Sequence, residues 1–538
     1  MNHRLGPCSS SHGTAICGAI LLALILATVA VYRLRLHRLA PYPGPLLSRL
    51  TSIPNWYHAR KGDRHEWLCR LHSEYGPTVR FSHNSLSFTT TPALDAIYRS
   101  KAHIIKSDWY QCVRDSAGGF ESTFTARQKS RHAIKRRLLS HAFSERALRD
   151  YEPRIRAHVD CWIERLALEA KSCPIGFDLG DWCSYLIFDI LGDLAYGSSF
   201  GLVAGTGDRG VAALVPKATG GWYSLGYHPI TKLVRYILFS TRLGPLLGGR
   251  SFHDNVQFRN FCLGKLKQRR QEAAKLAQEG RNQDMFAHLL NGQDPETGEG
   301  YSTGDLACES VLLMVAGSQS TAGGLAATFF YLAQNPSKLE RLRREIHGAF
   351  DEEPDIRYDA ANCKLASLPY LRACINESLR LSPPTPGHLP REVVGEDLPI
   401  EGRHVPVGTT VGVSPYVMHR SETYFAEPLT YLPERWTEQG THVAHKTMPG
   451  FAPFGAGPTG CIGQQLALME LSLGVAKLLW RFNLVADKGA QEGSAVEYKM
   501  RDRFVGQAEG PFKKGHLLKD PASLSTHSPF QRPHPSAP

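Results

Sequence analysis

The residues with the clearest chemical potential lie in a glycine-rich loop that ends at Cys461. Gly455, Gly457 and Gly460 precede this cysteine, and an amphipathic helix is predicted from Ile462 to about Phe482. The glycines allow a tight turn, and the first turn of a helix offers free N–H groups and a positive dipole end. Both features stabilise a thiolate. The loop therefore predicts a nucleophile or a soft-metal ligand at Cys461; a buried structural cysteine in a turn is the alternative.

A second stretch, Ala316 to Gly324, lies in the middle of a long helix predicted over 305–334. Gly317, Ser320 and Gly324 fall on one stripe of that helix, because they are three and four residues apart. An interior glycine costs about 1 kcal/mol relative to alanine. Two glycines on one stripe therefore indicate that something flat lies against the helix. A close contact between two helices through small residues is the alternative explanation.

Charged residues form two further groups at helical spacing. His132 and Arg136 are four residues apart, so they share one face of a predicted helix. That face is suited to an anion; a solvated basic face, or a docking surface for an acidic partner, is the alternative. Glu377 and Arg380 share a face of a helix predicted over 369–381. Taken alone, such a pair is usually a surface ion pair worth less than about 1 kcal/mol.

These stretches together resemble the sequence pattern of the cytochrome P-450 (haem-thiolate) monooxygenase family. Phe454 stands seven residues before Cys461, and Gly455 and Gly463 occupy the glycine positions of the family's cysteine-ligand loop. Pro433-Glu434-Arg435 follows Glu377 and Arg380 at the family's distance. The resemblance implies a mainly α fold with small β-sheets. It also implies haem b (iron protoporphyrin IX) as the cofactor, with Cys461 as the axial ligand of the iron.

The resemblance assigns roles to individual residues. The cofactor-binding set that it implies is His132, Arg136, Ala316, Gly317, Arg391, Phe454, Gly455, Cys461 and Gly463. Within this set, the resemblance places His132, Arg136 and Arg391 at the haem propionates. The catalytic set that it implies is Gln319, Ser320 and Thr321, which would relay protons to bound dioxygen. A structural set, Glu377, Arg380 and Arg435, would fix the segment behind the cysteine loop.

Three positions depart from the family pattern. The family's oxygen-activating motif has an acid followed by two threonines, whereas this chain has Gln319, Ser320 and Thr321. A serine hydroxyl can still donate and accept a hydrogen bond, but a glutamine does not release a proton at neutral pH. Thr459 stands where the family commonly has an arginine that faces a propionate. The resemblance therefore implies fewer charges at the propionates, and a haem that is lost more easily than in relatives.

Composition restricts the class of protein further. The 538 residues carry a net charge of +12, with a pI near 9.1, which favours acidic partners or anionic membrane surfaces. Nucleic acid is excluded as a partner because no nucleic-acid-binding motif occurs and the basic residues are scattered. The 12 cysteines lack paired spacing and form no CxxC. This pattern argues against a disulfide scaffold or a structural zinc site, and favours a reducing compartment.

The N-terminus predicts a membrane anchor. Residues 14–32 carry no charge and as a helix would extend roughly 28 Å, about one hydrocarbon core. Basic residues follow this segment, so the positive-inside rule keeps the rest of the chain cytosolic. A cleaved signal peptide is the alternative. The expected organisation is a lumenal N-terminus (1–13), a transmembrane helix (14–32), a basic and proline-rich hinge (33–50), a monooxygenase domain (51–515) and a disordered tail (516–538). By resemblance, the membrane is that of the endoplasmic reticulum, crossed once.

Two segments are expected to cover the substrate. Residues 106–125 contain aromatics without periodicity and, by resemblance, form a mobile loop over the substrate; the aromatic, glycine-rich region 220–249 forms its roof. The tract 205–210 matches GxGxxG, but neither a convincing strand before it nor a helix after it is expected. It is predicted to be a surface loop. The chain is therefore expected to have no flavin or nicotinamide domain of its own.

The finer resemblance is to fungal monooxygenases of specialised metabolism, including the pisatin demethylase and benzoate hydroxylase relatives. It is carried by Lys106-Ser-Asp-Trp-Tyr110 and by the segment 136–144. It implies insertion of one oxygen atom from O2 into an apolar small molecule. Electrons would come from a separate NADPH-cytochrome reductase, with cytochrome b5 as a second candidate donor. A same-fold enzyme that rearranges its substrate without O2, and a membrane-anchored haem-binding protein without activity, are the alternatives.

Overall fold

The computed structural model describes residues 10–99, 103–172, 178–278, 284–358, 364–437, 448–485, 497–508 and 516–519. Helices dominate these residues and the strands are short, so the predicted mainly α fold with small β-sheets is confirmed. The helices before residue 200 are α1 (Ser10–Val31), α2 (Leu46–Leu50), α3 (Ile53–Lys61), α4 (Arg64–Tyr75), α5 (Thr91–Leu94), α6 (Trp109–Ser116), α7 (Lys129–Ser140), α8 (Glu145–Ser172) and α9 (Leu179–Tyr196).

The remaining helices are α10 (Leu214–Leu225), α11 (Thr231–Ser240), α12 (Gly244–Leu247), α13 (Gly249–Gln271), α14 (Ala273–Gln278), α15 (Met285–Asn291), α16 (Thr303–Gln334), α17 (Pro336–Ala349), α18 (Pro369–Leu381), α19 (Pro415–Met418) and α21 (Gln464–Arg481). The strands are β1 (Thr78–Ser82), β2 (Ser85–Phe88), β3 (Ile104–Lys106), β4 (Arg391–Val393), β5 (Leu398–Ile400), β6 (Arg403–Val405), β7 (Thr410–Val413), β8 (Phe482–Val485), β9 (Met500–Arg503), β10 (Val505–Ala508) and β11 (His516–Lys519).

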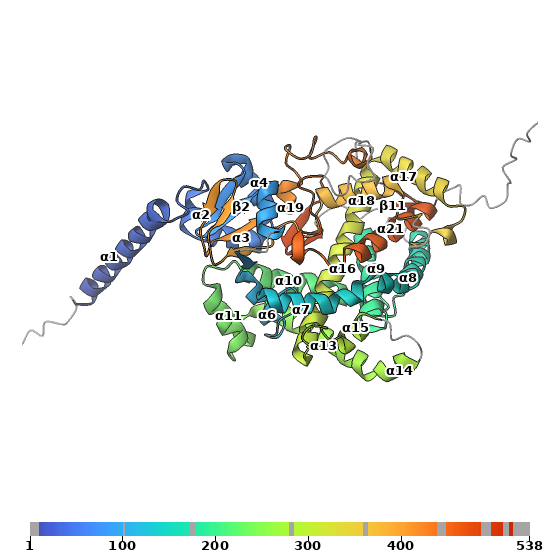
Figure 1. The fold of residues 1–538 in the computed structure, drawn as a ribbon, viewed down its shortest axis with the longest axis horizontal. Helices are drawn as coiled ribbons and strands as arrows, with labels where there is room; N and C mark the ends of the chain where they lie inside the picture. Colours follow the sequence, from blue (N-terminus) through green and yellow to red (C-terminus); the bar gives the residue numbers. More distant parts are fainter. Residues whose placement is uncertain are drawn as a thin grey trace, which may run out of the picture.

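The helix α16 crosses the middle of the molecule (Figure 1). Ser302 caps its first turn through a reciprocal pair of hydrogen bonds with Asp305, as a capping box does. Pro336 cannot continue the helix, so α16 ends at Gln334. Helices α9, α13, α18 and α21 pack around it and form the main hydrophobic core. This surrounding core makes α16 a rigid support for the predicted catalytic residues on it.

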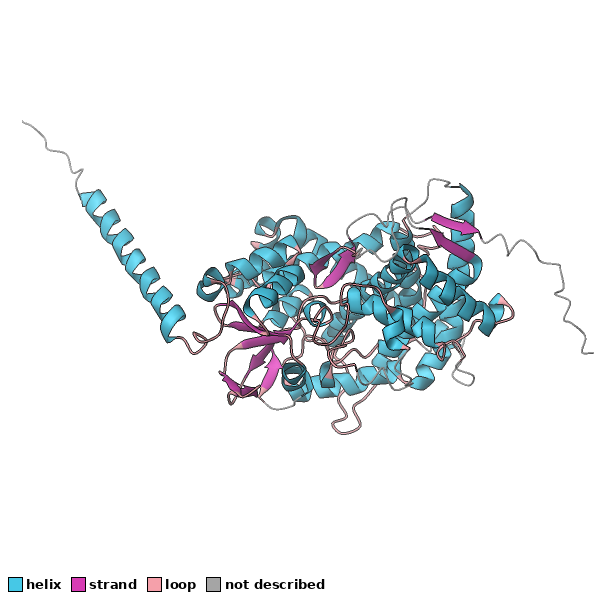
Figure 2. Ribbon diagram, turned by 90° about the horizontal axis from the view of Figure 1, so that it is seen from above, coloured by secondary structure: helices cyan, strands magenta, loops and turns pink. Residues whose placement is uncertain are grey.

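The five-stranded sheet lies at the end of the molecule that carries α1 (Figure 2). Its order is β1-β2-β7-β4-β3, in which β2 and β7 run parallel and the other neighbours run antiparallel. The strands β1 and β2 form a hairpin that turns at His83 and Asn84. In the pairing of β3 with β4, Lys106 lies directly opposite Arg391. Side chains directly opposite each other in an antiparallel pair share one face.

The helix α1 projects away from the other helices (Figures 1 and 2). Its apolar span, continued through a π-helical turn, covers Thr14–Leu36 with a mean hydropathy of 2.6, and none of it is buried inside the protein. A helix of this length and composition can cross a membrane once. This agrees in position with the anchor predicted over 14–32.

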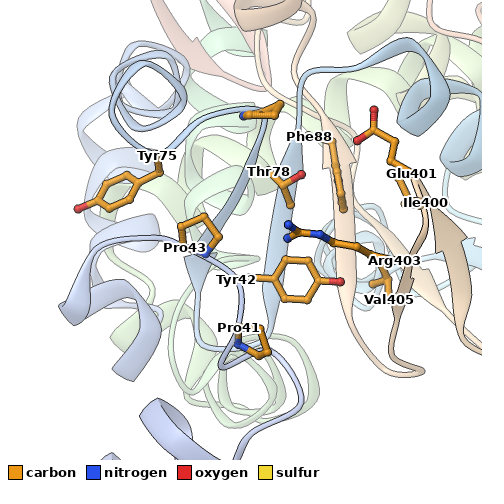
Figure 3. A pocket seen from close by; sticks show the side chains of 11 residues that line it. Pro41, Tyr42, Pro43, Tyr75, Thr78, Phe88, Ile400, Glu401, Arg403 and Val405 are labelled. Carbon is orange, nitrogen blue, oxygen red and sulfur yellow. The ribbon is translucent and has the colours of Figure 1, made fainter.

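The proline-rich hinge is packed onto the sheet. The buried Arg80 of β1 donates hydrogen bonds to the carbonyl oxygens of Arg33 and Leu39, at 2.9 and 3.2 Å. At Gly44, a Cβ would lie only 2.2 Å from the carbonyl oxygen of Arg80, so a side chain there would separate the hinge from β1. Figure 3 shows the result. Tyr42 and its neighbouring prolines form one wall of a small pocket whose other wall carries Arg403.

The segment 106–125 is more regular than predicted. It contains the helix α6, whose Trp109 is buried against Trp222 of α10, with ring centroids 5.7 Å apart. A Cβ at Gly226 would lie 2.2 Å from the Trp109 ring, so the glycine after α10 admits that ring. The predicted loop is therefore a helix over residues 109–116, because its aromatic residues are ordered by distant partners and not by local periodicity.

The region predicted as a roof, 220–249, consists of the end of α10 with α11 and α12. The tract 205–210 is mostly exposed and runs into a short 3-10 helix, Arg209–Ala213, which confirms the predicted surface position. The expectation that no helix follows the tract was wrong, because α10 begins directly after this 3-10 helix. The strand β11 pairs with β8, so regular structure continues into the segment predicted as a disordered tail from residue 516. The boundary at 516 is therefore too early; residues 520–538 lie outside the described part of the chain.

Candidate active site

Cys461 lies between a short 3-10 turn, Gly457–Thr459, and the start of α21. Its backbone N–H donates a hydrogen bond to the carbonyl oxygen of Phe454 across 2.8 Å, which closes the loop. Gly457 has φ of 67°, and a Cβ there would lie 2.1 Å from the carbonyl oxygen of Tyr98. The predicted glycine-rich loop is therefore present, and its glycines are required by turn geometry and by close approach to a neighbouring segment.

The Cys461 side chain is accessible from the central cavity, but the surrounding protein still desolvates it. This burial raises the pKa of the thiol, although the Gly463 N–H and the Arg136 guanidinium act in the opposite direction. A nucleophilic cysteine needs a lowered pKa. A bound metal ion, by contrast, deprotonates a coordinating thiol outright. Of the two chemical roles that the sequence left open, the arrangement supports the metal ligand.

The cavity is large and mainly apolar, and both the Cys461 loop and α16 contribute to its wall. Its volume is about 340 Å³. Typical small-molecule pockets measure roughly 300–1,000 Å³. The cavity therefore lies within the range of sites that bind small molecules. The charged side chains in the described lining are three bases and one acid: Lys106, Arg136, Arg391 and Glu470.

Arg391 is almost fully buried at 3% exposure, and its guanidinium reaches three structural elements. It donates to the Tyr110 hydroxyl across 2.7 Å and to the Thr459 hydroxyl across 2.9 Å. Its guanidinium carbon also lies 5.1 Å from the centre of the Tyr98 ring. Arg391 thus holds α6, the cysteine loop and β4 together at the cavity wall. The residue predicted from sequence to bind a propionate is in the cavity, and Thr459 orients it.

His132 and Arg136 both line the cavity from α7, as their spacing predicted. Burial and the nearby positive charges of Lys106 and Arg136 lower the pKa of His132 to about 3, so this histidine is neutral. A docking surface for an acidic partner was the alternative for the face of His132 and Arg136, and the two bases beside Arg136 on α7 are already engaged within the chain. Lys135 is buried and pairs with Asp305 at 2.8 Å. Arg137 is engaged by acidic residues of the same chain, Asp294 and Glu296.

The predicted catalytic stretch of α16 reaches the cavity through Ala316, Gly317, Ser320 and Thr321. The Ser320 hydroxyl donates to the carbonyl oxygen of Ala316 across 2.5 Å, so it is held within its own helix. Gln319 is absent from the described lining. Its side-chain oxygen is buried and makes no hydrogen bond among the described residues. The structure brings four of these five predicted residues to the cavity and leaves Gln319 to one side.

The glycine stripe of α16 has two different environments. A Cβ on Gly317 would lie 3.1 Å from Leu191 of α9, although Gly317 also lines the cavity. A Cβ on Gly324 would lie 3.2 Å from Leu379 of α18 and 3.6 Å from Leu471 of α21. Gly324 therefore serves a close helix contact, which was the alternative explanation, whereas Gly317 lies next to the open space.

Glu470 is an acid that sequence reasoning missed. It extends from α21, is 5% exposed, and lines the cavity next to Thr321. Burial raises the pKa of its carboxyl to about 8, while a hydrogen bond from the Thr321 hydroxyl opposes the shift. At neutral pH this carboxyl is mostly protonated. The available signal was its position as the only acid in the helix 464–481, between apolar neighbours.

Glu377, Arg380 and Arg435 meet outside the described cavity lining, behind the cysteine loop. Arg380 forms a two-bond ion pair with Glu377, at 2.8 and 2.9 Å, and both side chains are fully buried. Arg435 donates to the same carboxylate across 3.1 Å, and the Trp436 indole donates across 2.8 Å. Trp436 in turn packs on Phe451, with ring centroids 4.5 Å apart. This geometry supports the structural role that the resemblance implied.

The residues around this cavity fit haem. Cys461 offers a soft sulfur ligand, and small residues at 316 and 317 leave the α16 wall open. The basic side chains Arg136 and Arg391, with the neutral His132, supply donors for two carboxylates. The cavity wall carries more buried positive than negative charge, so an anionic ligand would be stabilised there. Lys106 is a fourth side chain with a nitrogen donor in this wall, and sequence reasoning did not include it.

Comparison with known proteins gives the same assignment. The family model described as cytochrome P-450 matches residues 41–502. The chain is 34% identical to cytochrome P-450 monooxygenase poxM of Penicillium oxalicum over 495 residues, which cover 91% of this chain and 92% of that protein. It is 32% identical to monooxygenase fscF of Fusarium equiseti, covering 91% and 94% of the two chains. It is 33% identical to monooxygenase astJ of Aspergillus oryzae, covering 85% and 89%. This chain belongs to the cytochrome P-450 family of haem-dependent monooxygenases.

Proposed function

We propose that this protein inserts one oxygen atom from O2 into an apolar intermediate of fungal specialised metabolism. The observation that carries the proposal is one cavity, mainly apolar, whose wall contains both Cys461 and the Ser320–Thr321 hydroxyls. Haem bound through Cys461 supplies the redox chemistry that activates O2. The similarity to fungal monooxygenases supports the class of substrate.

The chain's own residues would position the cofactor and control protons. Arg391, Arg136 and His132 bind the carboxylates of haem and so fix its orientation. Thr321 and Glu470 both line the cavity, and the Glu470 carboxyl beside the Thr321 hydroxyl is mostly protonated at neutral pH. Glu470 can therefore replenish a proton at the Thr321 oxygen, a role that Gln319 cannot fill. The apolar remainder of the lining excludes water from the substrate.

Electrons are proposed to come from a separate NADPH-cytochrome reductase, with cytochrome b5 as a second candidate donor. The GxGxxG tract 205–210 is followed by α10, but the element before it is the helix α9 and not the strand that a dinucleotide fold requires. The family match also spans most of the chain, from 41 to 502. Both observations support an external source of electrons.

The membrane of the endoplasmic reticulum is the proposed location. The exposed apolar span Thr14–Leu36 supports a single crossing. A second apolar surface lies on α11 and α12, where Leu233, Tyr236, Leu246 and Leu247 are exposed. Close to its start, His228 packs against Trp56 of α3, with ring centroids 4.9 Å apart. Large exposed apolar patches mark interaction sites, and this one would rest on the same membrane.

A carbon monoxide difference spectrum of the reduced protein tests thiolate ligation first. The proposal expects the spectrum of a thiolate-ligated haem in the wild type and its loss in Cys461→Ser. A spectrum typical of histidine ligation in the wild type would overturn the proposal. The next measurement is O2 consumption with NADPH and a reductase, coupled to product mass increased by one oxygen atom.

A second candidate function is rearrangement of the substrate without O2, and one observation favours it. Gln319 replaces the acid of the oxygen-activating motif, and its buried side-chain oxygen has no hydrogen-bond partner in the described part of the chain. An isomeric product formed without NADPH and O2 would establish this alternative. A haem-binding protein without activity would show thiolate ligation but no turnover with any reductase.

A further inference from the structure

A second pocket lies outside the central cavity, between the hinge and the hairpin of β5 and β6 (Figure 3). It encloses about 330 Å³, which is the size of a small-molecule site. One wall comes from Pro41, Tyr42 and Pro43 of the hinge, and the facing wall comes from the hairpin. None of its described lining residues also lines the central cavity. The pocket is therefore a separate site, which the oxygen chemistry proposed above does not use.

The pocket carries a cation and an anion that have no hydrogen-bond or ion-pair partner in the described part of the chain. The Arg403 guanidinium points from β6 toward Tyr42, and its carbon lies 5.8 Å from the centre of that ring. Asp397, just before β5, is already paired with Arg38. Glu401 stands at the turn of the hairpin, and Figure 3 shows its carboxylate directed away from Arg403. Both charges are therefore available to a ligand.

Hydroxyl groups add to the polar lining of this pocket. Tyr42 is only 6% exposed, yet its hydroxyl makes no hydrogen bond with the residues that the structure describes. Because a buried hydroxyl normally has a partner, this one indicates a polar group inside the pocket. The Thr78 hydroxyl also lines the pocket and is equally free among the described residues. Arg403, Tyr42 and Thr78 together offer donors to an anion with several oxygens, and a phosphate is such an anion.

The position of the pocket indicates where such a phosphate comes from. Tyr42 follows shortly after Leu36, the end of the apolar span, and the chain between them covers at most roughly 20 Å when fully extended. The pocket therefore lies close to the membrane surface at which that span ends. Leu36, Leu46 and Leu47 are 73%, 62% and 57% exposed on either side of the hinge residues in the pocket wall. Exposed leucines beside a charged pocket match a molecule that has a charged head and apolar chains.

We propose that this pocket binds the headgroup of one zwitterionic phospholipid, with its phosphate at Arg403 and Tyr42 and its ammonium group near Glu401. The acyl chains extend along the exposed leucines into the membrane. An exposed ion pair strengthens binding by at most roughly fivefold, so the pocket selects and orients a lipid but does not replace the apolar anchor. This inference rests on the proposed membrane location. Sedimentation of the full-length protein with vesicles tests that location separately, so the two can fail independently.

The test uses the full-length holoprotein in a maltoside detergent, and native mass spectrometry counts the lipids bound at each lipid concentration. Arg403→Gln should bind dioleoylphosphatidylcholine up to roughly fivefold more weakly than the wild type. Tyr42→Phe keeps the ring but loses the hydroxyl, and should bind it roughly threefold more weakly. An unchanged carbon monoxide spectrum in each variant shows that the haem site is intact. Equal binding by the wild type and both variants would overturn the proposal.

Arg35→Gln is the matched control. Arg35 is an exposed cation at the end of the apolar span, but it does not line the pocket. Its replacement should leave the binding of dioleoylphosphatidylcholine at the wild-type level. A loss equal to that of Arg403→Gln would overturn the pocket as the site, because it would show a general effect of surface charge.

Three further ligands separate the parts of the lipid. Dioleoylglycerol lacks the phosphate, so the wild type and Arg403→Gln should bind it equally; a difference would overturn the role of the phosphate. Dioleoylphosphatidylglycerol lacks the ammonium group, so Glu401→Gln should weaken the binding of phosphatidylcholine only; equal effects on both lipids would overturn the role of Glu401. Glycerophosphocholine has the headgroup without acyl chains. If it displaces phosphatidylcholine at equal concentration, the site binds a soluble phosphate ester and the lipid assignment is overturned.

Discussion

Arg391 donates a hydrogen bond to the Thr459 hydroxyl across 2.9 Å, and this contact joins the sheet to the cysteine loop. Thr459 stands where the family that the sequence resembles commonly has an arginine. The sequence therefore suggests only the loss of one positive charge. In the structure the hydroxyl takes a new role, because it accepts from the buried guanidinium and fixes its direction. The same guanidinium faces Lys106 across the strand pair. Thr459, which departs from the family pattern, therefore contacts one member of the buried pair Arg391 and Lys106.

Replacing Thr459 by valine is expected to speed haem release and lower thermal stability. Valine keeps the shape of threonine but removes the acceptor of the buried Arg391 N–H group. A hydrogen bond to a charged group contributes about 1.5–3 kcal/mol, so haem release should be faster by about tenfold or more. Thr459→Ser keeps the hydroxyl and should behave like the wild type. Equal haem release rates for valine and wild type would show that the contact has no effect on the cofactor.

Glu470→Gln is expected to flatten the pH dependence of stability. Burial raises the pKa of Glu470 to about 8, from an ordinary value of about 4.3 in the unfolded chain. Between these values the folded state keeps a proton that the unfolded state has released, so wild-type stability falls as pH rises. The glutamine variant lacks this contribution. Denaturant unfolding at several pH values between about 5 and 8 should show a steeper fall for the wild type; parallel profiles would contradict the assignment.

The same substitution tests the proposed proton supply at Thr321. If Glu470 replenishes that proton, the glutamine variant should form less product for each NADPH consumed, while haem content and the carbon monoxide spectrum stay unchanged. A matched control is Asp502→Asn, another buried acid, whose carboxylate accepts from Tyr223 across 2.8 Å outside the described cavity lining. The Asp502→Asn variant should form as much product for each NADPH consumed as the wild type does.

Glu309→Ala is expected to loosen the segment that carries α6. The buried Glu309 carboxylate accepts from the Thr123 N–H across 2.6 Å and from its hydroxyl across 2.8 Å. Removing it leaves these buried donors without a partner, at a cost of about 1–3 kcal/mol. Hydrogen exchange at residues 122–125 should accelerate in Glu309→Ala and much less in Glu309→Gln, which keeps an acceptor. Protection equal to the wild type in both variants would exclude this anchoring role.

Glu377→Ala is expected to prevent stable folding of the region behind the cysteine loop. The carboxylate is shared by the fully buried Arg380 and by Arg435 and Trp436. Removing one partner of a buried ion pair costs about 3–5 kcal/mol. The yield of protein with a thiolate-type carbon monoxide spectrum measures the effect. Glu396→Ala removes an exposed carboxylate that lies 3.7 Å from a His103 ring nitrogen, and it should leave the yield unchanged.

Membrane binding is expected to use two surfaces. Deleting residues 1–36 removes the apolar helix, but the exposed side chains of α11 and α12 remain. The truncated protein should still sediment with phosphatidylcholine vesicles, though more weakly. Adding Leu246→Glu and Leu247→Glu should abolish this residual binding, because both side chains are at least 60% exposed and apolar. Identical sedimentation of the two truncated forms would assign the patch no membrane role.

The amino-acid sequence by itself determined the features that depend on neighbouring residues. The bounds of α18, 369–381, and the end of α16 at Gln334 follow from the sequence. The cysteine loop was recognisable because glycine and cysteine positions are set by a single tight turn. The family resemblance rested on these same local patterns, and the match over 41–502 confirmed it.

Only the tertiary structure decided which charges meet. Lys106 and Arg391 are far apart in the sequence, and their opposition comes from the pairing of two three-residue strands. Glu470 looks like an ordinary helical glutamate until α21 is packed against α16 and its carboxyl is desolvated. From the sequence, Lys135 looks like part of a basic surface, but in the structure it is buried and pairs with Asp305. Local spacing states which face of an element a side chain occupies, but burial and charge balance depend on what packs against that face.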